Sequence, residues 1–170
     1  RYRIEKLLGR GGFAEVYRGW DDQLKRAVAI KVTFQKFLSA DAQKSYLAEA
    51  QTVAGLDHPH IVPVYEVGQM ENGDYYVVSR LIDGSDLSNR IRERPLSRPD
   101  AVAIIASVAE ALHHAHSKGL VHRDVNPANI LIDQQDRAFL TDFGIALREE
   151  DFGRSEGFAG TPKYMSPEQA

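Results

Sequence analysis

Alternating apolar and polar positions, broken by glycine-containing turns, dominate the first half of the chain. Residues 4–8, 15–20 and 27–33 are short runs rich in β-branched and aromatic side chains, and they predict a three-stranded antiparallel meander. Residues 61–67 and 74–82 have the same character on either side of an Asn-Gly turn, and they predict two more strands.

A helical pattern interrupts these strands once. Tyr46, Ala50 and Val53 recur at helical spacing after Ser39, a typical N-cap residue, and before Gly55, which favours a helix end. We therefore expect one helix between the third and fourth strands.

The character of the chain becomes mainly helical after residues 83–84. Ser97, followed by proline and aspartate, predicts the start of a helix. Residues 101–112 are apolar on nearly every side, which predicts a helix buried on several faces. Gly119 is expected to end this helix.

Two short strand-like runs, residues 130–132 and 138–140, follow this helix, with a polar turn between them. From residue 142 onward there is little periodicity, which is typical of a long functional loop. The pattern thus predicts an α+β fold with a small β-rich half, a hinge near residues 80–84, and the beginning of a helical half.

Composition limits the classes of function. With 43% apolar and 26% charged residues, the 170-residue chain is typical of soluble globular proteins. A net charge of -3 with intermixed signs favours neither nucleic acid nor anionic lipid as a partner, and no apolar run approaches the ~20 residues of a membrane span. The absence of cysteine excludes disulfides and thiolate catalysis. The chain opens on Arg1 and closes directly after a turn-like Ser-Pro-Glu, so we expect both ends to continue in a longer protein.

A glycine-rich turn, Gly9-Arg10-Gly11-Gly12, joins the first two predicted strands. Glycines at such a turn let backbone amides approach phosphate oxygens, because no Cβ stands in the way. Alone the signal is weak, since most glycine-rich hairpin turns bind nothing. No helix follows, which argues against a Rossmann or P-loop site.

Lys31 ends an apolar strand, and Glu49 lies on the apolar face of the predicted first helix. A lysine at a strand edge is usually solvated. A carboxylate on an apolar face, however, costs several kcal/mol without a partner. Each residue supplies what the other needs, and we expect them to pair.

Two polar segments lie where a connecting loop of ordinary composition would be expected. Residues 122–129 read His-Arg-Asp-Val-Asn-Pro-Ala-Asn between apolar runs, and Asp142 follows a strand and precedes Phe143 and Gly144. A lone Asp-Phe-Gly is ordinary turn chemistry. His122 is interpreted as a packing residue of its loop. The histidines at 113, 114 and 116 are interpreted as ordinary helix residues, because no cysteine or carboxylate stands at ligand spacing.

All of these segments occur in one order, and in that order the chain resembles the protein kinases: glycine-rich loop, strand lysine, helix glutamate, His-Arg-Asp loop with a later Asn, and Asp-Phe-Gly. The closing segment from Gly160 to Glu168 resembles the end of the activation segment of serine/threonine kinases, most closely the bacterial eukaryotic-like ones. The resemblance implies a bilobal fold, with an N-lobe over residues 1–82 and a partial, C-terminally truncated C-lobe over residues 83–170.

The resemblance also implies an ATP site. Lys31, fixed by Glu49, would hold the α- and β-phosphates, and the backbone of Arg80 to Ile82 would bind adenine. Asp86 would meet the ribose, and Ser79 would be an unusually small gatekeeper. The residues implied to cover the phosphates or enclose the adenine are Leu8, Gly9, Gly11, Phe13, Val16, Ala29 and Leu131.

Asn129 and Asp142 resemble the Mg²⁺ ligands of the family, and Asp124 resembles the catalytic base. Asn126 stands where serine/threonine kinases usually carry a lysine that contacts the transferring phosphate. Losing one charge-assisted contact costs roughly 1.5–3 kcal/mol, or about one to two decades of rate. The resemblance therefore implies a slow kinase with Asn126 in the catalytic set.

The implied activity is transfer of the ATP γ-phosphate to serine or threonine hydroxyls of a protein bound at the segment from Gly160 to Glu168. A second copy of the chain is a candidate partner for autophosphorylation. The implied location is the cytoplasm, on a parent protein with or without a membrane anchor. Asn126 keeps one alternative open, a pseudokinase that acts as a nucleotide-binding switch or scaffold. A kinase for small molecules is disfavoured by the peptide-platform character of the closing segment.

Overall fold

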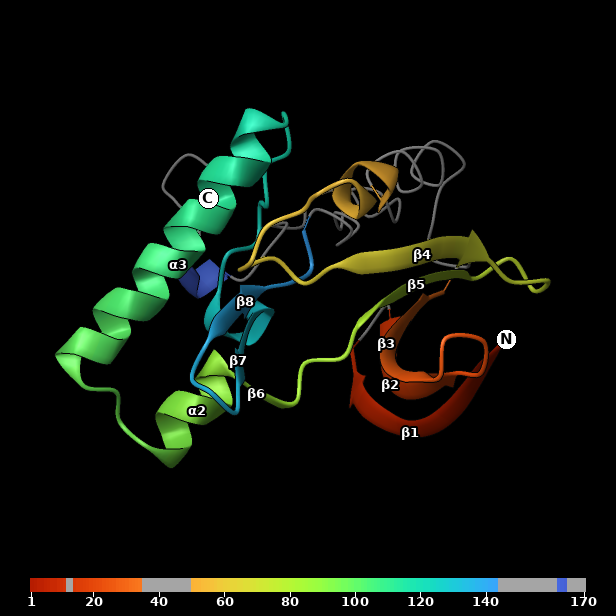
Figure 1. The fold of residues 1–170 in the computed structure, drawn as a ribbon, viewed down its shortest axis with the longest axis horizontal. Helices are drawn as coiled ribbons and strands as arrows, with labels where there is room; N and C mark the ends of the chain where they lie inside the picture. The colour runs from red at the N-terminus through yellow and green to blue at the C-terminus, as the bar shows by residue number, and fades with distance from the viewer. Residues whose placement is uncertain (12–13, 35–49, 144–161, 165–170) are drawn as a thin grey trace.

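The computed structural model describes residues 1–11, 14–34, 50–143 and 162–164 (Figure 1). Its larger sheet has five antiparallel strands in the order β1-β2-β3-β5-β4. The strands are β1 (Tyr2–Arg10), β2 (Ala14–Asp21), β3 (Arg26–Thr33), β4 (Val64–Gln69) and β5 (Tyr75–Arg80). The predicted meander and second hairpin are confirmed. The fourth strand begins only at Val64, because Pro63 precedes it and Ile61 makes a single bridge to Leu140 instead.

Period-two alternation along β3 decides which side chains reach the site. Val28, Ile30 and Val32 are buried on one face of the strand, together with Val78 of β5. Ala29 and Lys31 are half-buried on the opposite face. The apolar cluster thus fixes the strand, and the alternation turns Lys31 away from it.

A smaller sheet, β6-β7-β8, lies between the five-stranded sheet and the helices (Figure 1). It consists of β6 (Gly84–Asp86), β7 (Ile130–Asp133) and β8 (Ala138–Leu140). The hairpin β7-β8 matches the prediction. Neither β6 nor the helix that follows, α2 (Leu87–Glu93), was predicted from the sequence. The three residues of β6 are too few to show periodicity.

The long helix α3 (Arg98–Ser117) begins as predicted, with the Ser97 side chain accepting a hydrogen bond from the Asp100 backbone N–H. Its predicted burial on several faces is wrong. Ile104, Val108, Ala111 and Ala115 are buried, whereas Val102 and Ile105 are 69% and 60% exposed. One side of α3 packs on β8 and the core, and the side that carries Val102 and Ile105 is mostly exposed. The helix ends at Ser117, and Gly119 follows with φ +75°.

Residues 58–63, which we call the strap, join the two sheets. Val62 N–H donates to Leu140 O (2.9 Å), and Leu140 N–H donates to His60 O (2.8 Å). At the other end Arg80 N–H donates to Pro63 O (3.0 Å). The strap therefore connects β8 to the strand that leads into the hinge.

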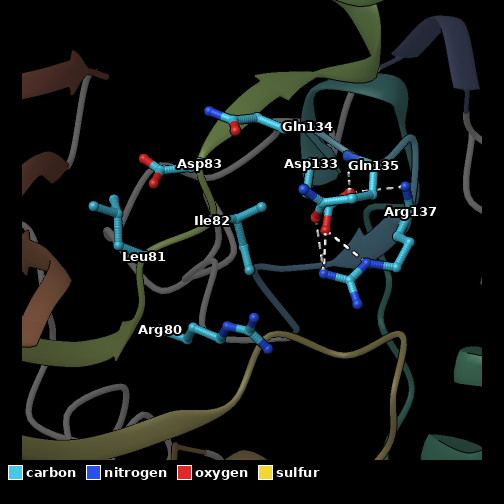
Figure 2. A pocket seen from close by; sticks show the side chains of 8 residues that line it. All are labelled: Arg80, Leu81, Ile82, Asp83, Asp133, Gln134, Gln135 and Arg137. Carbon is cyan, nitrogen blue, oxygen red and sulfur yellow. Dashed lines mark hydrogen bonds and ion pairs between the residues drawn. The ribbon is translucent and has the colours of Figure 1, made fainter.

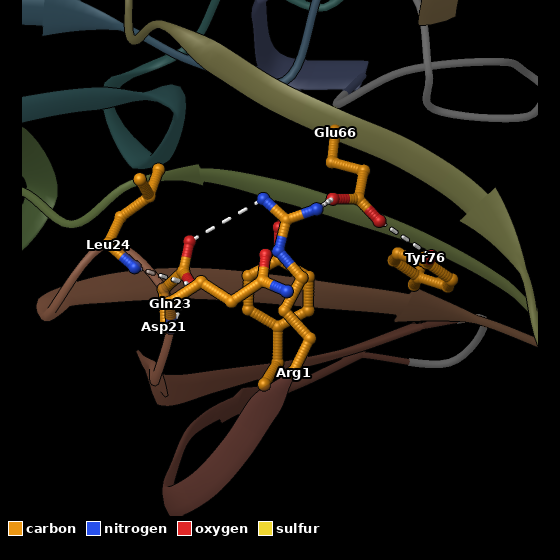
Figure 3. A network of polar contacts seen from close by, with 7 residues as sticks. Arg1, Asp21, Gln23, Leu24, Glu66 and Tyr76 are labelled. Carbon is orange, nitrogen blue, oxygen red and sulfur yellow. Dashed lines mark hydrogen bonds and ion pairs between the residues drawn. The ribbon is translucent and has the colours of Figure 1, made fainter.

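A polar network joins the start of the chain to the end of β2 and to β4 (Figure 3). The Asp21 side chain is fully buried and accepts from the backbone N–H groups of Gln23 and Leu24. Burial raises the pKa of the Asp21 carboxyl, but these hydrogen bonds and the Arg1 guanidinium outweigh it and leave the pKa below its usual range. Glu66 of β4 bonds the Arg1 side chain and so ties the start of β1 to the far edge of the sheet.

Only the end of the predicted first helix falls within the described residues. Residues 50–54 are helical, and Gly55 N–H donates to Thr52 O at the helix end, where Gly55 was expected to stop it. The predicted positions Ser39, Tyr46 and Glu49 lie outside the described residues. Within residues 1–11, 14–34, 50–143 and 162–164, no helix is both long enough and apolar enough to span a membrane.

Candidate active site

Lys31 of β3 and Asp142, two residues beyond β8, meet across the two sheets. The Lys31 Nζ atom lies 2.8 Å from Asp142 Oδ1, and the two side chains are 20% and 33% exposed. Burial of this kind strengthens an ion pair relative to one on the open surface. Asp142 adopts φ +59°, a conformation that costs energy for a residue with a Cβ and that is typical of functional sites. The predicted partner of Lys31, Glu49, lies outside the described residues.

The loop of residues 122–129 is held by its own amides. Asn129 Nδ2 donates to both the backbone O and the Oδ2 of Asp124, each at 2.9 Å. Asn126 is buried, with 6% of its surface exposed. Its Nδ2 donates to Asp124 O (3.2 Å), and its Oδ1 accepts from Ala128 N–H (2.9 Å). The Asp124 carboxylate is therefore fixed by Asn129, while Asn126 shapes the loop and caps the 3₁₀ turn η2 (Pro127–Asn129).

His122 locks this loop to the end of β8, which confirms its interpretation as a packing residue. The ring is 1% exposed, lies 4.8 Å from the Phe143 ring, and makes a 2.9 Å contact from Nε2 to Thr141 O. Its Nδ1 accepts from Asp124 N–H (3.3 Å). Since a carbonyl only accepts, Nε2 carries the proton and the ring is neutral. Burial accordingly lowers the pKa of His122.

The two candidate metal ligands approach each other through the backbone. Thr141 N–H donates to Asn129 O (3.0 Å), so the residue beside Asp142 is bonded to Asn129 itself. Among the described residues, nothing donates a hydrogen bond to Asn129 Oδ1 or Asp142 Oδ2. A carboxylate and an amide oxygen are the hard donors that Mg²⁺ accepts while keeping water and phosphate ligands. The donor set fits that ion.

The residues implied to enclose the nucleotide come from both sheets. Val16 is paired with Lys31, and Ala29 is paired with Ser79. Leu131 lies on β7 opposite Asp86. Leu8, Gly9 and Gly11 lie at the end of β1 and in the turn after it, whereas Phe13 lies outside the described residues.

The Asp86 carboxylate serves a structural purpose here. It caps α2 by accepting from Asn89 N–H at 2.9 Å. A role toward a ribose, as the resemblance implies, stays a prediction.

The hinge forms one wall of a pocket whose other wall is the β7-β8 turn (Figure 2). Arg80 lies with its guanidinium 5.6 Å from the Phe139 ring centre, and Arg137 lies 5.8 Å from the same ring. Arg137 also binds Asp133 (2.7 Å). The packing of Arg80 and Arg137 on Phe139 was not predicted from the sequence. The only signal was the polar turn, which indicates a loop and nothing about its packing partner.

Comparisons with known proteins agree with this geometry. The family model for the protein kinase domain matches residues 2–170. The chain is 41% identical over 172 residues to the serine/threonine-protein kinase PknE of Mycobacterium bovis and 41% identical to PknD of Mycobacterium tuberculosis. These alignments cover 99% of this chain but only 30% and 26% of those relatives, so the chain spans less than a third of their length.

Solved structures show the same fold. The kinase domain of Mycobacterium tuberculosis PknI superposes with a TM-score of 0.78 at 33% identity, covering 85% of this chain and 59% of that one. A structure of Rad53 in complex with AMP-PNP superposes with a TM-score of 0.75 at 27% identity, covering 84% and 38%. The bilobal α+β fold and the resemblance to bacterial serine/threonine kinases are thus confirmed, and the chain belongs to the protein kinase domain family.

Proposed function

We propose that this chain transfers the γ-phosphate of ATP to serine or threonine hydroxyls of a protein substrate. The observation that carries the proposal is the meeting of Lys31 and Asp142, 2.8 Å apart, beside the Asp124–Asn129 pair. At this junction of the two sheets, Lys31 supplies a cation, and Asp142 and Asn129 supply hard oxygen donors. Asp124 supplies a carboxylate that Asn129 fixes in place. Phosphoryl transfer needs these groups, since its catalysis is mainly positioning and charge neutralisation.

Each residue takes a separate part. Lys31 binds phosphate oxygens, and Asp142 holds it in place until the nucleotide arrives. Asp142 and Asn129 would hold Mg²⁺, which would supply positive charge to offset that of the phosphate oxygens. Asp124 accepts the proton of the substrate hydroxyl, and the two hydrogen bonds from Asn129 aim its carboxylate.

Asn126 acts on the loop rather than on the phosphate. Its amide is buried and both amide atoms are engaged inside residues 124–128. The activity we propose is therefore slower than that of a kinase with lysine at this position. The protein substrate, which we expect at the segment from Gly160 to Glu168, and autophosphorylation between two copies belong to the same proposal.

Separating binding from chemistry tests these roles. We would measure Mg²⁺-dependent ATP affinity by calorimetry, and phosphate transfer in parallel, for the wild type, Asp124→Asn and Asp142→Asn. Asp124→Asn is expected to keep the wild-type affinity within about threefold and to lose transfer, because the base touches the substrate hydroxyl and not the nucleotide. Asp142→Asn is expected to lose the Mg²⁺ dependence of binding.

The pattern of losses distinguishes the outcomes. If Asp142→Asn binds Mg²⁺ and ATP like the wild type, the assignment of the metal site is wrong. ATP binding without transfer in the wild type would instead indicate a pseudokinase.

A further inference from the structure

Three histidines gather where the strap meets α3. His58 and His60 belong to the strap, and His114 belongs to α3. The His58 ring centre lies 5.2 Å from that of His114 and 5.8 Å from that of His60. The Nε2 atom of His114 is buried without a hydrogen-bond partner in the described residues.

His58 holds the strap through an atom that can take up a proton. Its Nδ1 accepts the backbone N–H of His60 at 3.2 Å, so in this conformation Nδ1 is unprotonated. Protonation would place a hydrogen on Nδ1, the atom that now accepts the His60 N–H. An attraction would become a contact between two donors, and the turn of the strap would lose this hydrogen bond.

The strap transmits that change to the site. His60 makes a 2.9 Å contact from its ring Nδ1 to Ala138 O, and its backbone O accepts from Leu140 N–H. Ala138 and Leu140 are the first and last residues of β8, and Asp142 follows two residues later. The position of Asp142 therefore depends on a strand that His60 holds at both ends.

The surroundings of His58 decide how readily it takes up a proton. From its own segment it faces His60 and Asp57, and from α3 it faces His114 and Glu110. Burial and the two histidines lower the pKa of His58, and the two carboxylates raise it by a smaller amount. An open hollow on the α3 side, lined in part by Glu110 and His113, gives a proton access to the ring.

We propose that His58 is a proton-sensitive anchor: acid opens the strap at His60, loosens β8, and displaces Asp142 from Lys31. Transfer activity would then fall in mildly acidic surroundings and recover on neutralisation. The effect on activity rests on the function proposed above, whereas the opening of the strap does not.

Replacing His58 with asparagine keeps the hydrogen bond to the His60 N–H and removes the group that takes up a proton. In His58→Asn the side-chain oxygen can accept the His60 N–H in the same two-residue turn, and asparagine does not titrate between pH 5 and 8. His58→Ala removes the acceptor at every pH. His116→Asn, an exposed position on α3, serves as the matched control.

Hydrogen exchange of the full-length protein, corrected for the intrinsic pH dependence of exchange, measures the opening of the strap directly. In the wild type and in His116→Asn, we expect protection of residues 58–63 and 138–142 to fall about tenfold between pH 7.5 and 5.5. His58→Asn should keep most of its protection, and His58→Ala should be weakly protected at both pH values. The affinity for Mg²⁺ and ATP, measured on the same samples, should fall more steeply with acid in the wild type than in His58→Asn.

Two results would overturn the proposal. The first is strap protection in the wild type that does not change with pH, which needs no variant to be observed. The second is an equal loss of protection in His58→Asn. Absence of ATP binding at every pH, with the exchange result as expected, would reject the proposed kinase function and leave the anchor standing.

Discussion

At the scale of single residues, Asn126 shows what the sequence could and could not predict. The position of Asn126 in the loop identifies it as a replacement for a lysine. Its burial and its bond to Asp124 O come only from the fold, because both depend on how the loop turns through Pro127. Lys31 is a similar case. Its burial could be expected, but Asp142 lies 111 residues away, and no local pattern links the two.

Asn126→Lys tests the reason for a slow reaction. Lysine is long enough to leave the loop and reach the transferring phosphate, so we expect transfer to rise about tenfold to a hundredfold, equivalent to ~1.5–3 kcal/mol. Loss of the cap on η2 should lower the unfolding free energy by about 1 kcal/mol. Single-turnover kinetics and urea unfolding measure the two effects. Asn126→Gln is the control, since it adds length without charge. A rise in rate with Gln equal to that with Lys would show that the missing charge is not what slows transfer.

His122 predicts how stability depends on pH. Because the pKa of His122 is lowered by burial in the folded state, the unfolded chain binds a proton below about pH 6.5 while the folded chain does not. The contribution of His122 to the free energy of unfolding is therefore fully present above about pH 6.5. It declines as the pH falls, by at most about 1.4 kcal/mol per pH unit. Urea unfolding between pH 5 and 8 should show a smaller slope for His122→Gln than for the wild type. Parallel curves for the two proteins would rule this out.

At the scale of elements, the strands were predictable where burial imposes alternation and turns punctuate it. β2 and β3 fall within a residue or two of their predicted limits, since Val28, Ile30 and Val32 must share one face. β6 was not predictable, because a three-residue strand exists only through its pairing with β7. Tertiary contact, rather than local preference, creates such elements.

Gly84 is the residue that makes this pairing possible. A Cβ at Gly84 would lie 1.8 Å from Ile132 O, a backbone atom that cannot move aside, whereas a Cβ at Gly9 would meet nothing within 4 Å. We expect Gly84→Ala to lower the unfolding free energy by more than about 2 kcal/mol, and Gly9→Ala to change it by less than about 0.5 kcal/mol. Thermal unfolding of the two variants provides the comparison. Equal melting temperatures would mean that β6 does not pair as described.

At the scale of the whole molecule, the outer face of α3 exposes apolar side chains. Val102 and Ile105 are exposed in a chain that covers 59% of the PknI kinase domain it superposes on. Burial was predicted from the number of apolar positions, and apolar positions do not say which partner covers them. A helix of this composition is typically covered on both sides.

We predict that additional chain covers this face in the full-length protein. Val102→Asp should then change the stability of residues 1–170 by less than about 0.5 kcal/mol, yet lower that of the full-length protein by about 2 kcal/mol or more, since it would bury a carboxylate. Chemical unfolding of both forms, with the exposed Lys118→Asp as a charge control, makes the comparison. A similar small effect in both would show that the face stays exposed.

A phosphotransfer site at the junction of the two sheets is tested most directly by observing transfer itself. The full-length protein would be incubated with γ-labelled ATP and Mg²⁺, with itself and a generic basic protein as acceptors, and Asp142→Asn as the blank. We expect slow, Mg²⁺-dependent incorporation of label on serine or threonine, well above that blank. Label no greater than that of Asp142→Asn, despite measurable ATP binding, would contradict it and leave a nucleotide-binding protein without transfer activity.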